Sequence, residues 1–128
     1  MPRVSAAFFA TGALFLAGGM IWGMYMGAHE DFMLATAHAH LNLLGWVTAA
    51  LYGTFYALTR ETMSVRLAWL NYILSTVGVV VMIPALSMQL TTNDIPKWNP
   101  FVVAGSGIVF LGLLTFVISA VREVFRRR

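Results

Sequence analysis

Residues 67–90 read LAWLNYILSTVGVVVMIPALSMQL, and this long apolar run decides the fold class. A helix needs about 20 mostly apolar residues to cross about 30 Å of hydrocarbon. Three other stretches meet the same requirement, at about residues 4–26, 37–58 and 100–121. None of the four runs contains Asp, Glu, Lys or Arg. The sequence therefore predicts an all-α, integral membrane bundle of four transmembrane helices, with residues 1–128 forming a single domain.

The composition excludes several classes of function. Only 10% of the residues are charged, whereas a soluble domain carries about a quarter. The absence of cysteine excludes disulfides, thiolate metal sites and thiol catalysis. The net charge of +3 comes from basic residues near the ends of the apolar runs, not from a patch on a soluble face. We therefore expect the lipid bilayer, and not nucleic acid, as the partner of this charge.

The basic residues also predict the orientation in the membrane. Cytoplasmic loops carry an excess of Lys and Arg. In the predicted topology, the side with the two termini carries Arg3, Arg60, Arg66, Arg122, Arg126, Arg127 and Arg128. The opposite side carries only Lys97. We expect both termini in the cytoplasm (N-in/C-in) and a multi-pass protein of the bacterial inner membrane.

All three histidines of the chain fall near the outer membrane face. His29 follows the first span, and His38 and His40 open the second within Ala37–Trp46, AHAHLNLLGW. Ionisable residues within spans are rare and tend to be functional. Imidazole is a common ligand of zinc, copper and haem iron. The alternative is that these side chains only mark the interfacial start of a helix and hydrogen-bond water.

The spacing of His38 and His40 separates their side chains. Residues two apart on an α-helix differ by about 200°, so the two rings point to opposite faces. Small and polar residues continue the His38 face, which suits the bundle interior: Asn42, Gly45, Ala49, Tyr52 and Tyr56. Apolar residues continue the His40 face: Leu44, Val47, Leu51 and Leu58. That face suits lipid, a neighbouring subunit or a flat apolar cofactor.

The run His40-Leu-Asn-Leu-Leu, continuing through Gly53 to Tyr56, resembles the second helix of haem-copper oxidase catalytic subunits. The likeness is strongest to the nitric oxide reductase and C-type oxidase branches, which read His-Thr-Asn at this place. The whole chain also resembles small four-helix proteins described as oxidase subunit I-like. The resemblance implies that His40 is an axial ligand of a haem, with Asn42 as the motif asparagine.

The chain departs from that family in a way that limits its function. The oxidases place their second low-spin haem ligand and the histidines of their binuclear site on later helices, and this chain has no histidine after His40. We therefore expect no complete oxidase or reductase in one protomer. A haem on His40 would take its sixth ligand from His29, His38, a methionine or another subunit. Otherwise the iron would be five-coordinate and able to bind a small gas.

Glycines and methionines leave further interpretations open. Glycines of the first and fourth spans allow close helix packing or could seat a flat porphyrin: Gly19, Gly23, Gly27, Gly105 and Gly112. Methionines near the histidines suit copper, especially Cu(I), but are also ordinary packing residues: Met24, Met26, Met33 and Met88. A copper-handling or oxidase-assembly factor, with His29, His38 and His40 as metal ligands, and a cofactor-free structural subunit are therefore the alternatives.

Together these patterns predict a membrane haem b protein that works in electron transfer or in O2 or NO sensing beside a respiratory chain. A c-type cytochrome or a respiratory complex is the expected redox partner. We also expect a homo-oligomer, either a dimer or a trimer. Four helices enclose little space beyond their own side chains, and His38 and His40 point in opposite directions.

Overall fold

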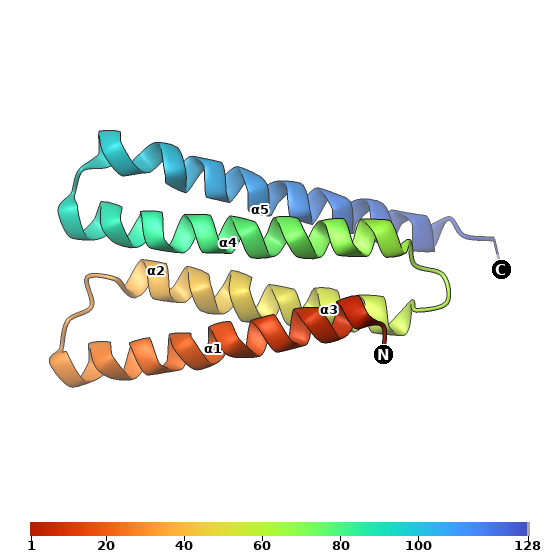
Figure 1. The fold of residues 1–128 in the computed structure, drawn as a ribbon, viewed down its shortest axis with the longest axis horizontal. Coiled ribbons are helices and arrows are strands. Elements are labelled where there is room, and N and C mark those ends of the chain that lie inside the picture. Colours follow the sequence, from red (N-terminus) through yellow and green to blue (C-terminus); the bar gives the residue numbers. More distant parts are fainter. Residues whose placement is uncertain (128) are drawn as a thin grey trace.

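A computed structural model describes residues 1–127 of the chain as a bundle of long helices (Figure 1). Arg128, one of the residues that predict the orientation, lies outside the described residues. The helices are α1 (Arg3–His29), α2 (Ala35–His40), α3 (Ala49–Leu58), α4 (Val65–Thr92) and α5 (Ile95–Val124). A π-helical segment, η1 (Leu41–Thr48), joins α2 to α3.

Within residues 1–127, four continuous helices are long and apolar enough to cross a membrane. They are Arg3–His29, Ala35–Leu58, Val65–Thr92 and Ile95–Val124, which confirms the predicted four-helix, all-α class. Each contains one of the runs predicted from sequence. The fourth helix begins five residues earlier than predicted, because Asp94 caps it and proline is tolerated in its first turn.

Short loops make sequence neighbours antiparallel, so both chain ends lie at the same end of the bundle (Figure 1). Glu30 and Asn93 terminate α1 and α4 in the left-handed region, with φ of 49° and 54°. The Ser64 and Asp94 side chains accept hydrogen bonds from the first-turn amides of Leu67 and Lys97, at 3.4 and 3.3 Å. These caps satisfy backbone groups that the helix ends leave free.

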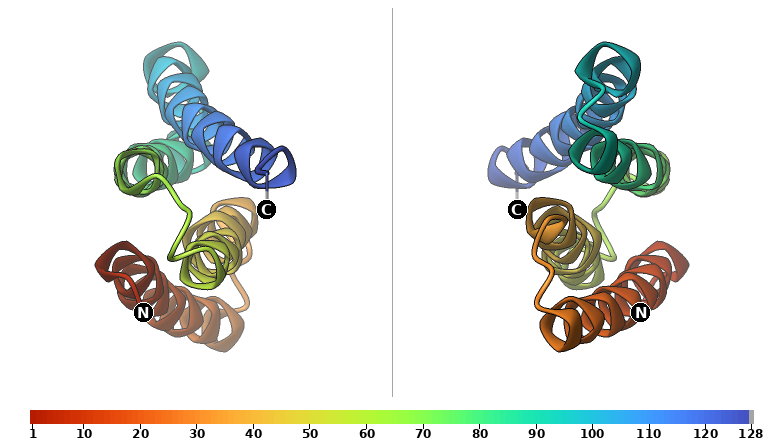
Figure 2. Two further views of the ribbon diagram at one scale, coloured as in Figure 1. Left: turned by 90° about the vertical axis from the view of Figure 1, so that its right-hand side faces the viewer. Right: turned by 90° about the vertical axis from the view of Figure 1, so that its left-hand side faces the viewer.

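The bundle consists of two helix pairs, α1 with the α2–α3 span and α4 with α5 (Figure 2). The second pair packs closely because glycines bring the two backbones together. A Cβ built on Gly105 would lie 2.7 Å from the Met82 backbone nitrogen, and one on Gly78 would lie 2.7 Å from the Val109 backbone nitrogen. At Gly112 the nearest atom is the Ser75 hydroxyl, also at 2.7 Å. These contacts support the packing interpretation for Gly105 and Gly112.

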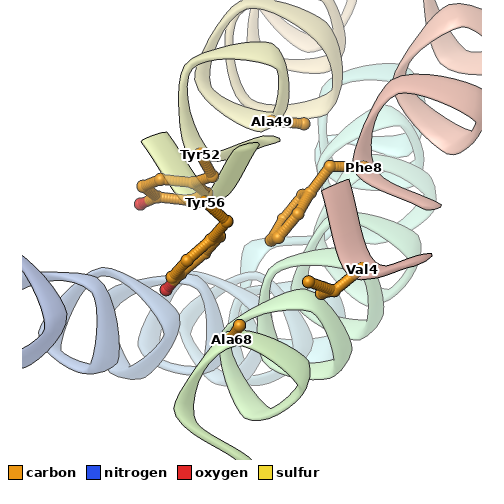
Figure 3. Packing of buried hydrophobic residues seen from close by; sticks show 6 residues of the cluster. All are labelled: Val4, Phe8, Ala49, Tyr52, Tyr56 and Ala68. Atoms are coloured by element: carbon orange, nitrogen blue, oxygen red, sulfur yellow. The ribbon is translucent and has the colours of Figure 1, made fainter. Parts of the chain in front are cut away.

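Aromatic residues pack the half of the bundle that holds the two chain ends. Phe8 of α1 stacks on Tyr56 of α3, with ring centroids 6.0 Å apart, and both side chains are buried (Figure 3). Beside them the buried Asn71 amide donates to the Tyr56 hydroxyl at 3.2 Å, and Tyr56 also contacts the Ser119 hydroxyl at 3.3 Å. This polar chain links α3, α4 and α5 where no water is available to compete.

Gly105 provides a test of the α4–α5 packing. An added methyl would meet the backbone of Met82, which cannot rotate away, so we expect Gly105→Ala to destabilise the protein by about 1–3 kcal/mol. Gly107 lies two residues away with no atom within 4 Å of a built Cβ, which makes Gly107→Ala the matched control. Unfolding in mixed detergent micelles, followed by circular dichroism, measures both. Equal stability of the two variants would contradict the packing.

The orientation is testable by labelling, because a chain without cysteine gives no background. Asp31 and Glu61 are exposed in loops at opposite ends of the bundle. With both termini in the cytoplasm, a membrane-impermeant maleimide should label Asp31→Cys in intact spheroplasts and Glu61→Cys only after lysis. The reverse pattern would move the histidines to the cytoplasmic side.

Candidate functional site

A groove of about 930 Å³ lies between the α2–α3 span and α5, and Met82 of α4 also lines it. Sites for small molecules and cofactors have volumes of roughly 300–1,000 Å³ and are mostly apolar with a few polar groups. The groove fits both criteria. The residues that line it are Ala35, Thr36, Ala39, His40, Leu43, Leu44, Thr48, Tyr52, Met82, Ser106, Val109, Phe110 and Leu113.

The tilt of α5 opens this groove. Toward the end that holds the two chain termini, the Phe116 ring contacts the rings of Tyr52 and Phe55, with centroids 4.6 and 5.0 Å apart. Toward the other end α5 follows α4 and diverges from α2 (Figure 2). The glycine contacts with α4 prevent α5 from closing on α2. The groove is therefore closed by aromatic residues on one side of the membrane and widens toward the end that holds the histidines.

His40 lies in the wall of the groove with its ring exposed. Its Nδ1 is 2.8 Å from the Thr36 carbonyl oxygen of the preceding turn. A carbonyl can only accept, so Nδ1 carries the proton, and the neutral ring has its lone pair on Nε2. Histidines that bind metals commonly donate their second ring nitrogen in this way. In His40 the lone pair of Nε2 is therefore available to bind a metal, and the residue lines a mostly apolar groove.

His38 points away from the groove, toward α1. Its ring meets Trp22 edge-on, with centroids 5.9 Å apart, and lies 3.0 Å from the Cβ position of Gly23. Asn42, one turn later, fills the space beside Gly19 and has its Nδ2 3.4 Å from His38 Nε2. Gly19 and Gly23 thus make room for these two side chains, and no other atom lies within 4 Å of a Cβ on Gly27.

Two polar atoms of this pair have no partner. His38 Nδ1 and Asn42 Oδ1 are both buried, and neither makes a hydrogen bond within the chain. An unpaired buried polar atom costs free energy, so the pair is held by the surrounding packing of α1. To reach a metal in the groove, His38 would have to leave its position against Gly23.

His29 is exposed at the end of α1, where its ring stacks on Tyr25 with centroids 4.1 Å apart. Its Nδ1 is bonded to the Tyr25 carbonyl at 2.9 Å. The three histidines therefore occupy separate surroundings. Across residues 1–127, no group of three or more His, Asp or Glu side chains lies close enough to hold a metal ion.

The π-helical segment changes the set of residues below His40. An α-helical spacing placed Val47 and Leu51 there; both are exposed, and neither lines the groove. A π-helix bonds residue i to i+5 instead of i+4, so each following side chain shifts around the axis. As a result Thr48 and Tyr52 line the groove below His40. The Thr48 hydroxyl donates to the Leu43 carbonyl at 2.8 Å, five residues back.

Sequence reasoning missed the groove residues on the other helices, among them Met82 and Ser106. The Ser106 hydroxyl donates to the Met82 thioether sulfur at 3.2 Å, across the α4–α5 contact. No periodicity in the sequence indicates this pair, because it depends on the register set by Gly105. Of the methionines considered for copper, Met26 is buried, while Met24, Met33 and Met88 are exposed.

Comparison with known proteins does not identify the chain. No protein-family profile, curated protein or solved structure matches it.

The different surroundings of the two histidines predict different effects on stability. His38→Ala removes the partner of Asn42 and leaves space beside Gly23, so we expect the free energy of unfolding to fall by about 1–3 kcal/mol. His40→Ala changes an exposed ring, and its effect should stay within about 0.5 kcal/mol. Detergent unfolding compares both with the parent protein. A larger loss of unfolding free energy for His40→Ala than for His38→Ala would contradict the assignment of His38 to the packed face and His40 to the exposed face.

Proposed function

We propose that this protein binds haem b in the groove, with His40 as an axial ligand of the iron, and that it serves electron transfer or gas sensing beside a bacterial respiratory chain. The observation that carries the proposal is the His40 ring. Its Nδ1 is fixed by a backbone carbonyl, while Nε2 is free at a large, apolar groove. The sequence resemblance of the His40–Tyr56 stretch to the haem-binding helix of the oxidases would make the same residue the ligand.

The lining of the groove suits a flat, mostly apolar cofactor. Leu43 and Leu44 follow His40 on one wall, and Val109, Phe110 and Leu113 form the other. Such side chains exclude water from a porphyrin face. They have no polar groups that the porphyrin would leave without a hydrogen bond. The bound haem would supply one-electron chemistry or a site for a diatomic gas. The protein would supply the axial nitrogen and the apolar surroundings that tune the iron.

The copper alternative has less support. A copper site built from His29, His38 and His40 would need three rings that the fold keeps in different surroundings. Haem requires only one or two protein ligands, so a single free imidazole is enough. A purely structural role would not require the groove or the imidazole that lines it.

Haem binding is tested by reconstitution with haem b in mild detergent. The parent protein should show a Soret band and a fixed haem-to-protein ratio. His40→Ala should lose most of this haem, whereas His38→Ala should keep it, because His38 faces α1. Full haem with an unchanged spectrum in His40→Ala would refute the assignment.

The same sample separates the alternatives. Copper found by metal analysis without a Soret band would favour the copper-handling factor, and neither signal would favour the structural subunit. Native mass spectrometry counts subunits and haems together. The proposed homo-oligomer should give a dimer or trimer that carries haem.

A further inference from the structure

We infer that Met82 is the second axial ligand of the haem, held in place by Ser106; this inference rests on the proposed function. It would make the iron six-coordinate, with one imidazole and one thioether. That coordination suits electron transfer and not gas sensing, because no position is left open on the iron.

The first support is the position of the sulfur. Met82 belongs to α4 and lines the groove together with His40 of α2. Its side chain is almost fully buried, and its Sδ accepts a hydrogen bond from Ser106 at 3.2 Å. Serine in a helix often bonds the carbonyl of the preceding turn. Here the hydroxyl instead donates to the thioether, and both residues line the groove.

The second support is depth in the membrane. The rings of Tyr52 and Phe116 are in contact and so lie at one level. His40 precedes Tyr52 by twelve residues, and Ser106 precedes Phe116 by ten. At 1.5 Å per residue these distances are about 18 and about 15 Å, and the π-helical segment shortens the first. His40 and the Ser106–Met82 pair therefore lie at the same depth to within one helical turn.

The third support is the absence of a competing ligand in the groove. Among the residues that line it, only His40 and Met82 have side chains that commonly bind haem iron axially, apart from Tyr52 near the closed end. His38 is packed against Trp22, and His29 is stacked on Tyr25. Methionine has three rotatable bonds, so its sulfur can turn toward an iron at little cost. A thioether ligand raises the reduction potential of haem.

The test uses the haem-loaded protein with Met82→Leu, a substitution of similar volume. Met88→Leu is the matched control, because Met88 lies on the same helix, is exposed and does not line the groove. We expect Met82→Leu to keep its haem on His40 but to lose the thioether charge-transfer band of the ferric protein. Its midpoint potential should fall, and its reduced form should bind carbon monoxide readily. Met88→Leu should match the parent protein.

A positioning variant adds a second readout. Ser106→Ala removes the hydroxyl that holds the sulfur, so the ferric spectrum should become a mixture of five- and six-coordinate forms, and Ser106→Thr should restore the parent spectrum. If Met82→Leu does not fold, the charge-transfer band of the parent protein decides the question. Haem bound through His40 without that band, or a Met82→Leu protein with the parent's potential and carbon monoxide binding, would overturn the Met82 assignment and leave the proposed function intact. Failure of the parent protein to bind haem would refute both.

Discussion

Backbone hydrogen bonding in lipid is the constraint on which the rest of the structure depends. In hydrocarbon each unpaired N–H or C=O costs several kcal/mol, so a chain that crosses the membrane satisfies these groups within its own helices. All turns of this protein accordingly fall at the ends of the four long helices. Once the backbone is satisfied, packing between helices is decided by shape and by a few polar side chains. Here those are the glycine contacts of α4 with α5 and the hydrogen bonds around Asn71.

The second span meets the same constraint with a different hydrogen-bond pattern. Through η1 the backbone bonds are π-helical, and the Thr48 hydroxyl donates to a carbonyl five residues back. π-helical turns are rare and are often found at functional sites. In this protein the segment begins directly after His40. It places Gly45 against Phe15 of α1 while keeping Thr48 and Tyr52 on the groove side. One helix can therefore serve a packed interior and an open groove at once.

The sequence was sufficient to predict the helices but not the groove. The four apolar runs predicted every span, because length and hydropathy alone decide whether a segment crosses a membrane. The spacing of His38 and His40 correctly placed their rings on opposite faces, since both lie in the α-helical part of the span. The groove depends on the tilt of α5, which follows from the contacts of Gly105 with α4 and of Phe116 with α3. Such contacts join residues far apart in the chain, and no local pattern encodes them.

The surroundings of the two histidines also explain why one is the better ligand. The Asn42 amide hydrogen-bonds Nε2 of His38, and Gly23 and Trp22 pack against the His38 ring. His38 could therefore bind a metal only after this packing is broken. His40 requires no rearrangement, because its only hydrogen bond is to its own helix through Nδ1. His40 lines a groove whose other lining residues include leucine, valine and phenylalanine, and His40 Nδ1 is the ring nitrogen that bonds its own helix. A metal or a hydrogen-bonding ligand could use the Nε2 lone pair, whereas lipid tails could not. In this groove the single imidazole is therefore the group on which the proposed ligand depends.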